Sequence, residues 1–272
     1  MIEVCPVCRL DIKLFAKFRE YIIYKCQNCG LGFTSNLSPH FGSYHGDDSY
    51  VEEEELFRNI FLKRVKKILQ FKKKGSALEI GCSTGLMLSL LKDKGFNVEG
   101  VEISKKAARM AQKRGIDVII KPFEEIFFKK KYDLIIFNHT LEHLKNPFQA
   151  LEKSQKILIK NGLLYIDLPN FDSLSASFLK KKWPYLLPDE HLWHFTEKSL
   201  KLLFNKLNLK IVYVEKSSGI LNLDNPYLEL WQSFFNLKKR FITNLATLPT
   251  AILFSKMDLG DDLLIIAKKD EK

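Results

Sequence analysis

The chain has 272 residues, of which 46% are hydrophobic and 28% are charged, and its formal net charge is +11. This composition is that of a globular protein and excludes a disordered or fibrous chain. No uninterrupted apolar run of about 18 residues predicts a membrane span, and no secretory leader is recognisable, so we expect a cytoplasmic protein with reduced thiols. The positive excess is mostly lysine, and it favours an anionic partner such as RNA, a phosphorylated sugar or a membrane surface only weakly.

Four of the five cysteines form two Cys-x-x-Cys pairs near the N-terminus: Cys5 with Cys8, and Cys26 with Cys29. Each pair turns the backbone so that two thiolates face one point, and four thiolates complete a tetrahedral Zn²⁺ shell with no open position. We therefore predict a structural zinc ribbon over residues 1–35, with free or redox-active thiols as the alternative. Residues 36–50, rich in Gly, Ser and Asp, are expected to form a linker.

Helical and strand patterns alternate through the remainder of the chain. Residues 51–74 predict a helix with acidic residues at its start and lysines at its end. The predicted strands are 77–81, 97–103, 117–120, 132–138, 163–169, 209–217 and 261–269, and the predicted helices between them are 84–95, 104–115, 146–162 and 196–208. This alternation predicts an α/β fold over residues 51–272, a doubly wound and mostly parallel sheet, with a helical insertion at about 222–258.

A glycine-containing turn, "LEIGCSTG", connects the first of these strands to its helix. A dinucleotide-binding turn needs a third glycine and a P-loop needs a lysine, and neither is present. Gly81, Ser83 and Gly85 therefore predict a ligand that approaches the backbone closely but lacks a pyrophosphate. Glu79 can accept hydrogen bonds from a ligand ammonium group, and Glu102 can accept two from a ribose diol. An amino-acid tail, a ribose and an adenine together describe S-adenosylmethionine.

These stretches, together with "YDLIIFNHTLEHLKNPFQALEKSQKILIKNGLLYIDLPN", resemble the class I S-adenosylmethionine-dependent methyltransferases of the type 11 and type 23 groups over residues 76–216. The resemblance implies a seven-stranded Rossmann-like sheet and S-adenosylmethionine as cofactor. It also implies cofactor contacts from Asn138, from Ile103 on the adenine ring, and from Phe123 and Glu124 in place of the usual acidic residue. Four paired cysteines before such a domain are similar to a subgroup that acts on sugars, glycans and small metabolites, which favours O-methylation of a small-molecule or glycan-linked acceptor.

The motif "NHTLEH" after the fourth strand places His139, Glu142 and His143 on one face of a helical turn. Three interpretations are open. Glu142 and His143 brace the loop under the cofactor, or His143 is a general base, or the three residues bind a divalent metal. The last interpretation comes from a resemblance to quinone-biosynthesis O-methyltransferases.

The stretch "WPYLLPDEHLWHFT", residues 183–196, gathers aromatic and titratable side chains outside any predicted regular element. This density predicts a loop that lines an acceptor pocket, and in the resembling methyltransferases the region closes over the acceptor. His191 is the first candidate for a base and His194 the second. A purely structural role for His194 is equally consistent with the sequence.

Residues 226–257 are strongly apolar and carry a basic cluster at 238–240. They are consistent with a lid, a peripheral membrane contact, a dimer contact, or packing on the protein's own sheet. Two other functions are open: an RNA-base methyltransferase that holds RNA with its ribbon and lysine-rich surface, and a silent cofactor-binding module. The ribbon shows no clear basic and aromatic stacking patch, which disfavours RNA.

Overall fold

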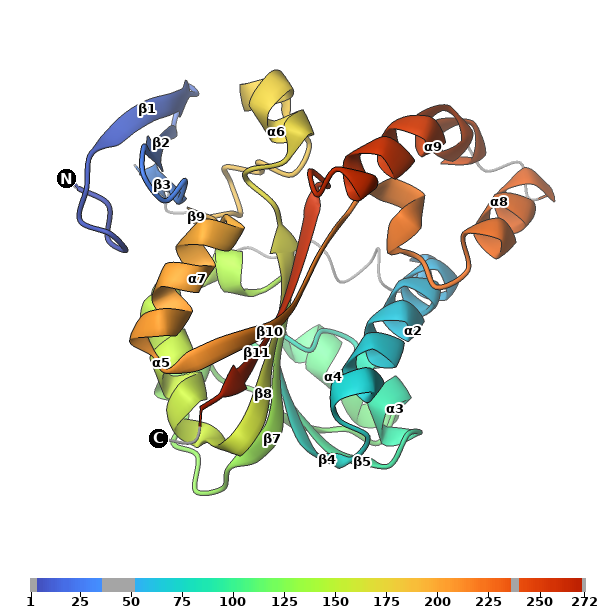
Figure 1. Cartoon of the computed structure of the whole chain (residues 1–272). Coiled ribbons are helices and arrows are strands. Elements are labelled where there is room, and N and C mark those ends of the chain that lie inside the picture. Colours follow the sequence, from blue (N-terminus) through green and yellow to red (C-terminus); the bar gives the residue numbers. More distant parts are fainter. Residues whose placement is uncertain (1–3, 36–51, 236–239, 271–272) are drawn as a thin grey trace.

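A computed structural model describes residues 4–35, 52–235 and 240–270. The chain forms one large and one small sheet (Figure 1). The large sheet has seven strands in the order β10-β11-β8-β7-β4-β5-β6. Its strands are β4 (Gly75–Ile80), β5 (Phe96–Val101), β6 (Asp117–Ile119), β7 (Tyr132–Asn138), β8 (Leu158–Pro169), β10 (Leu209–Ser217) and β11 (Asp262–Lys269).

The direction of the strands confirms the predicted mostly parallel, doubly wound sheet. The pairs β4–β5, β5–β6, β4–β7 and β7–β8 are parallel, whereas β11 runs antiparallel to both β8 and β10. The chain order reverses at the β4–β7 pair, because β5 lies on the other side of β4. In sheets of this kind, ligands bind outside the carboxyl ends of the strands at such a reversal.

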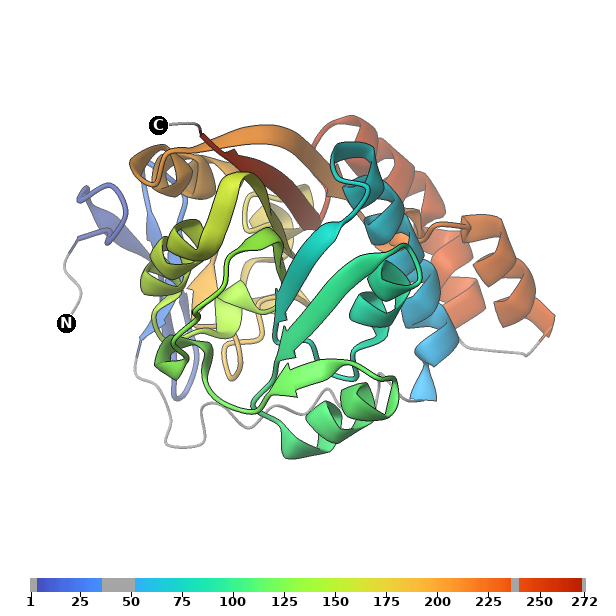
Figure 2. The ribbon, with the colours of Figure 1, turned by 90° about the horizontal axis from the view of Figure 1, so that it is seen from below.

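Helices cover both faces of this sheet (Figures 1 and 2). On one face lie α2 (Glu54–Phe71), α3 (Leu86–Lys92) and α4 (Lys105–Lys113), and on the other lie α5 (Pro147–Ile157) and α7 (Glu197–Lys206). Successive side chains of a strand point to opposite faces, so Ile135 packs in the core below α5 and α7 while Ile136 packs in the core below α2 and α3. Burial on both faces explains why the central strands read as continuous apolar runs.

One predicted boundary is wrong by several residues. The helix expected over 146–162 begins at Pro147, with Asn146 as its N-cap, but it ends at Ile157. Strand β8 starts at Leu158 instead of 163, and its pairing with β7 shifts register at that point. Asn161 has a φ of 60°, so the first part of the strand is irregular. The helix-like spacing of apolar residues in this segment gives no sign of that irregularity.

The N-terminal region forms a small antiparallel sheet from β1 (Ile12–Lys17), β2 (Ile22–Cys26) and β3 (Gly32–Ser35). A fourth strand, β9 (Trp193–His194), comes from the stretch that was expected to be irregular and pairs with β3. That expectation is wrong for these two residues, because the edge of the ribbon offers unpaired backbone groups that they satisfy. The small sheet is therefore completed by a segment far away in the sequence.

Between β10 and β11 the chain forms α8 (Pro226–Phe235) and α9 (Arg240–Lys256), which lie at the same end of the molecule as α6 (Leu174–Leu179) (Figure 1). Trp231 and Ile242 on these helices are 62% and 73% exposed. The predicted linker, and the lysines at 238 and 239, fall outside the described residues. Among the described ranges, each helix is too short or too polar to cross a membrane.

Candidate functional site

A cavity of about 550 Å³ opens at the carboxyl edge of the sheet, where β4 and β7 meet. Its walls come from residues 80–81, 101–103, 122–125, 138–140, 143–146 and Glu190. Each of the first four segments lies at the end of a strand or shortly after it, so the topology itself gathers them at one edge. Among the expected cofactor residues, this cavity wall includes Gly81, Glu102, Ile103, Phe123, Glu124 and Asn138.

The turn after β4 has the backbone shape that glycine permits. Gly81 has a φ of 71°, and a Cβ built on it would lie 2.6 Å from the Thr140 Oγ1. Gly85 has a φ of 73°, and its Cβ would lie 2.7 Å from the Cβ of Ala111. Both glycines are therefore required by conformation and by space. Ser83, at a φ of 44°, adopts the same left-handed region in spite of its side chain.

Glu102 is held rigidly at the end of β5. Its Oε2 accepts a hydrogen bond from the Ser83 backbone N–H at 2.9 Å, and its Oε1 accepts one from the Ser104 N–H at 2.8 Å. The side chain is 6% exposed and lines the cavity. A carboxylate offers about four acceptor directions, so two backbone donors fix its orientation without using all of them.

Glu79 lies on β4 with a side chain that is 2% exposed, and it is not part of the cavity wall. Its Oε2 has no hydrogen-bond partner among the described residues. Burial and the nearby negative charge of Glu102 raise its pKa well above the ordinary value for a glutamate. The Oδ1 of Asn138, which does line the cavity, is also buried without a partner in the described part of the chain. Near the end of β4, two neighbouring glutamates therefore make the electrostatic potential negative. In the same place, one oxygen of Glu79 and one of Asn138 lack donors among the described residues.

The opposite wall holds the residues that the resemblance assigns to the adenine. Ile103 is 59% exposed, whereas Phe123 is 2% exposed and packs edge-on against Phe137. The Phe123 carbonyl accepts a hydrogen bond from the Lys153 Nζ at 2.5 Å, which fixes the segment containing Glu124. Ile103 therefore offers an apolar surface to a flat ring, and Glu124 lies beside it in the wall.

The three histidines chosen from the sequence occupy different positions. His143 lines the cavity, and neither His191 nor His194 belongs to its wall. His191 packs against His143 with ring centroids 4.7 Å apart. Burial lowers the pKa of His191 to about 4, so its ring is neutral near pH 7. The structure thus brings two of the three histidines together beside the cavity.

His194 lies on the ribbon side of this pair. Its Nε2 is 3.1 Å from the Thr34 Oγ1, and that hydroxyl donates to the His191 carbonyl oxygen at 2.8 Å. Because a hydroxyl has one hydrogen to donate, the His194 Nε2 must be the donor to Thr34. Burial lowers the pKa of His194 to about 3. These contacts connect the ribbon to the loop that carries His191 and His194.

His139 is a further imidazole in the cavity wall, next to Glu142 as expected, but its second carboxylate partner, Asp262, was missed by sequence reasoning. Its Nε2 lies 3.4 Å from the Asp262 Oδ1, and its Nδ1 lies 3.6 Å from the Glu142 Oε1. Burial acts to lower the pKa of His139, but these two carboxylates outweigh it and raise the pKa to about 10. Behind them, Arg64 forms an ion pair with Asp167 and lies 3.6 Å from Asp262. Asp262, Asp167 and Arg64 come from β11, β8 and α2, so no local motif predicts that they meet His139.

The two tryptophans of the 183–196 stretch do not line the cavity, so the expectation of an aromatic acceptor pocket is wrong for them. Trp183 packs against Phe171, and its Nε1 donates to Asp261 at 3.0 Å. Trp193 packs against Phe33 of the ribbon and donates to the Leu144 carbonyl oxygen at 3.0 Å. Their aromatic surface joins the ribbon to the large domain, and both indole N–H groups are satisfied.

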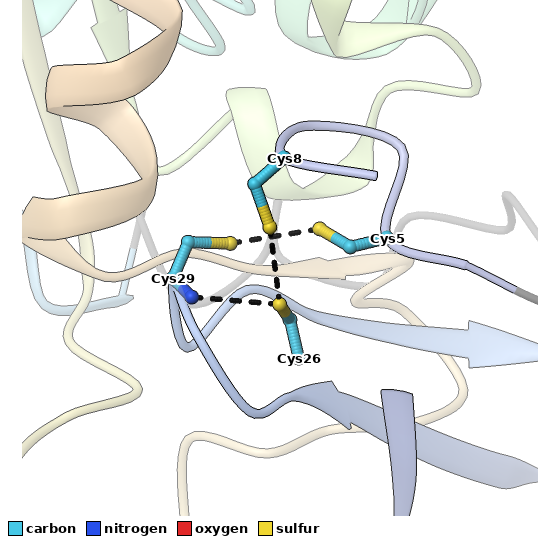
Figure 3. Close-up of side chains that lie close together, drawn as sticks. All are labelled: Cys5, Cys8, Cys26 and Cys29. Carbon is cyan, nitrogen blue, oxygen red and sulfur yellow. Dashed lines mark hydrogen bonds between the residues drawn. The ribbon is translucent and has the colours of Figure 1, made fainter. Parts of the chain in front are cut away.

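The four paired cysteines converge on one point (Figure 3). The Sγ atoms of Cys5 and Cys29 are 3.5 Å apart, and those of Cys8 and Cys26 are 3.4 Å apart. A tetrahedral shell with Zn–S bonds of about 2.3 Å has sulfur–sulfur edges of about 3.8 Å, so the arrangement fits a four-thiolate metal site. The Cys29 backbone N–H also donates to the Cys26 Sγ at 3.4 Å, as thiolate sites require.

Comparison with known proteins agrees with this geometry. A family model described as a methyltransferase domain matches residues 52–214, more than half of the chain. An uncharacterized protein of Methanocaldococcus jannaschii is 33% identical over 137 residues, which is 50% of this chain and 63% of that protein. The chain thus spans less than two thirds of the length of this relative.

Two further proteins widen the comparison. A ubiquinone biosynthesis O-methyltransferase of Pelagibacter ubique is 28% identical over 182 residues, covering 61% of this chain and 74% of that protein. The crystal structure of the plantazolicin methyltransferase BamL, in complex with a triazolic desmethylPZN analog and SAH, superposes with a TM-score of 0.57 at 20% identity, covering 85% of this chain and 93% of the other. With its sheet order, its glycine turn and the matched family model, the chain belongs to the methyltransferase-domain family and has the class I S-adenosylmethionine-dependent fold.

Proposed function

We propose that the protein is an S-adenosylmethionine-dependent methyltransferase that modifies an oxygen of a small-molecule or glycan-linked acceptor. The observation that carries this proposal is a pair of buried glutamates, Glu102 in the cavity wall and Glu79 nearby on β4, outside that wall. Burying two carboxylates near each other is unfavourable even though the Arg64 guanidinium partly offsets it, and Glu79 retains an acceptor oxygen without a donor among the described residues. A ligand ammonium group supplies the donor that Glu79 lacks, and a ribose diol can add hydrogen bonds to Glu102.

Different residues of the chain are proposed to bind different parts of this cofactor. Gly81 permits close approach, Glu102 orients the ribose, and Glu79 with Asn138 attracts the amino-acid end. Ile103 and Phe123 bound the place of the adenine, with Glu124 beside them. When bound, S-adenosylmethionine supplies an activated methyl group, so the protein has mainly to align the acceptor and to manage its proton.

His143 is the proposed contact with the acceptor. Of the three histidines expected to be catalytic, it is the one in the cavity wall, and the ring of His191 packs against its ring. His194 acts through the loop and the ribbon, and we assign it a positioning role. Oxygen as the methylated atom is supported by the name of the Pelagibacter ubique relative, which is an O-methyltransferase.

The cysteine cluster is proposed to hold a structural Zn²⁺. The support is the four convergent sulfurs, three of them on buried cysteines, with no position left for a water or substrate. Because thiolates stay reduced in the cytoplasm, the same cluster supports the expected cytoplasmic location.

Binding of SAH, measured by calorimetry, tests the cofactor proposal. The Glu102→Ala variant should bind about 10- to 100-fold more weakly, since a buried hydrogen bond to a charged group is worth about 1.5–3 kcal/mol. Glu152→Ala on the exposed face of α5 is the matched control and should bind as the wild type does. No SAH uptake by the wild-type protein would reject the proposal.

The acceptor is sought with S-adenosylmethionine and metabolite extracts, by mass spectrometry for a product heavier by one methyl group. A methylated small molecule or glycan is the expected result. Methylation of RNA, with RNA retention that falls steeply as salt rises, would instead assign the protein to nucleic acid.

A further inference from the structure

We propose that α6, η3 (Lys180–Lys182), α8 and α9 form a docking surface for an anionic phospholipid membrane. These elements extend from the carboxyl edge of the parallel strands, the edge at which the cavity opens. Strand β8 ends there before α6, β10 ends there before α8, and α9 leads to the start of β11, because Asp262 pairs with both Pro169 and Ser217. The inference concerns where the protein binds, and it does not rest on the proposed methyl transfer.

The two helices between β10 and β11 carry large apolar side chains on their outer side. On α8 the exposed ones are Tyr227, Leu228, Trp231, Phe234 and Phe235. On α9 and directly after it they are Ile242, Leu245, Ile252, Leu253 and Met257. The fully buried side chains on the described part of these helices are small or polar: Glu229, Ser233 and Ala251. A helix that packs only on its own protein buries its large apolar side chains instead.

Polar contacts attach these helices to the rest of the protein. The side chain of Asn59 on α2 exchanges two hydrogen bonds with the backbone of Asn225, at 3.1 and 2.9 Å. The Arg240 guanidinium at the start of α9 pairs with Glu229 of α8 at 2.5 Å and with Glu53 at 2.7 Å. Neither helix contributes to the cavity wall, so a lid over the cavity is not supported. The apolar side therefore remains available to a partner.

The charge of this surface is positive. Residues 174–187 and 226–258 contain seven basic and two acidic residues, which are Lys180, Lys181, Lys182, Lys238, Lys239, Arg240 and Lys256 against Glu229 and Asp258. Glu229 is buried and paired with Arg240, so it contributes no negative charge to the surface. The three lysines of η3 and Lys256 are exposed and form no ion pair within the described part of the chain.

The helix α6 brings the lysines of η3 to the same end of the molecule as α8 and α9 (Figure 1). Its first N–H, that of Leu174, donates to the Leu259 carbonyl oxygen at 3.2 Å, just beyond the end of α9. The Ser175 hydroxyl donates to Asp261 at 2.9 Å. Phe178, two residues before the lysines, is 77% exposed. Apolar side chains and cations thus occur together at this end of the protein.

This combination matches the surface of an anionic membrane. Aliphatic and aromatic side chains of an interfacial helix enter the boundary between headgroups and acyl chains, and tryptophan is enriched at that depth. Each lysine close to the surface adds attraction to anionic lipid. A second copy of the chain fits less well, because a two-fold interface presents the same patch from both sides and would bring like charges together. We therefore assign the surface to anionic lipid.

The test is binding of the full-length protein to vesicles, measured by co-sedimentation. Vesicles of phosphatidylcholine and phosphatidylglycerol should bind the wild type, and vesicles of phosphatidylcholine alone should bind it at least about 10-fold more weakly. Raising the salt from about 0.1 M to about 1 M should weaken binding to the anionic vesicles, because the Debye length falls from about 10 Å to about 3 Å.

Substitutions separate the apolar contribution from the charged one. Trp231→Ser and Ile242→Ser should each weaken binding to anionic vesicles about 10-fold, since each removes a large apolar group from the interface. Replacing all three lysines of η3 by glutamine should weaken it about 100-fold, since each lysine near an anionic surface contributes about tenfold or somewhat less. The substituted side chains are exposed, so the fold should be preserved.

The chain offers a matched control at the opposite edge of the sheet. Residues 127–131, "FFKKK", have nearly the composition of residues 178–182, "FLKKK", but they precede the amino end of β7. Phe127 is 85% exposed. Phe127→Ser, and glutamine at all three of Lys129–Lys131, should bind vesicles as the wild type does. An equal loss of binding in these controls would show that total charge and apolar exposure matter and that the proposed surface does not.

Tryptophan fluorescence gives a second measurement on the unsubstituted protein. Trp231 is exposed, whereas Trp183 is buried and Trp193 is half-buried. Anionic vesicles should therefore shift the emission of Trp231 to shorter wavelength, and brominated lipid should quench it. Thermal unfolding followed by circular dichroism establishes that each variant is folded.

Three results would overturn the inference: no binding of the wild type to anionic vesicles, equal binding to neutral vesicles, or wild-type binding by the folded variants of Trp231, Ile242 and η3. A dimer that Trp231→Ser dissociates, seen by light scattering in a protein that ignores vesicles, would assign the face to a second copy. Absence of SAH binding with vesicle binding intact would reject the proposed methyl transfer and leave the docking surface standing.

Discussion

The ribbon and the seven-stranded domain are stabilised in different ways. The large sheet buries apolar side chains on both faces, and its central strands contribute Leu134, Ile135, Ile136 and Phe137 with no exposed surface. The ribbon has few such residues of its own, and the side chains at its centre include the cysteines. A segment of about 30 residues buries too little apolar surface to fold alone, so we expect the proposed metal to supply much of the difference.

The boundary between the two regions is built from polar contacts and aromatic packing. Lys198 and Lys206 of α7 donate to carbonyl oxygens of Asn28 and Val7 in the ribbon, and the Thr196 hydroxyl donates to that of Cys29. The cysteine end of the ribbon thus rests on α7 and its opposite edge on β9. The ribbon therefore supports the loop that carries His191 and His194, and it is not a freely hinged module.

Removal of the ribbon metal should give the largest difference between the two regions. A structural Zn²⁺ contributes on the order of 10 kcal/mol to the folding of small four-ligand sites, so a chelator or Cys26→Ser should unfold β1 to β3. The large sheet should stay folded, because its core does not depend on the metal. Amide hydrogen exchange checks this: strand β2 should lose protection while β7 keeps it.

The control is Cys82→Ser, which removes a buried thiol from the glycine turn and leaves the cluster intact. It should preserve protection of β2. Equal loss of protection in β2 and β7 after metal removal would show that the two regions unfold as one unit and that the large sheet also depends on the metal.

The contact between the regions should respond to a smaller change. Thr34→Val keeps the shape of the side chain but removes the hydroxyl between the His191 carbonyl oxygen and the His194 ring. Leaving buried polar groups unsatisfied costs about 1–3 kcal/mol. Thermal unfolding should therefore show a loss of stability of that size, and zinc retention should be unchanged.

Ser35→Ala is the matched control for this change, since the Ser35 hydroxyl donates within the ribbon to the Ile22 carbonyl oxygen at 3.2 Å. It is half-buried and should cost less than Thr34→Val. If the two substitutions have the same effect, the hydroxyl of Thr34 does not couple the ribbon to the histidine loop.

The strands, the glycine turn and the positions of Glu79 and Glu102 were predictable because each is encoded locally. The alternation of strand and helix patterns along the sequence predicts the sheet. The predicted end of the second strand places Glu102 at the carboxyl edge of that sheet. The role of Trp193 was not predictable, because an aromatic residue that packs on a ribbon has the same local pattern as one that lines a pocket. Likewise, His139 meets Asp262 only after β11 inserts beside β8, an arrangement that no short motif contains.

The smallest expected effect lies at the end of the sheet farthest from the cavity, and it is a dependence on pH. Burial acts to raise the pKa of Asp133, but the Lys72 ammonium at 2.8 Å and hydrogen bonds from Ser76 outweigh it, and the pKa is lowered. A carboxylate with a lowered folded-state pKa stabilises the protein above its unfolded pKa of about 3.9, and that contribution disappears as pH falls through the folded value.

Asp133→Asn should accordingly cost about 1 kcal/mol at pH 7, the size expected for a partly exposed ion pair with hydrogen bonds. Urea unfolding of both proteins from pH 7 to pH 3 checks this, and the difference in unfolding free energy should stay constant down to about pH 5 and narrow below about pH 4. Acid also protonates the thiolates of the ribbon, but that loss occurs equally in both proteins and cancels in the difference. A gap between the two proteins that widened in acid would mean that Asp133 does not stabilise the sheet as a carboxylate.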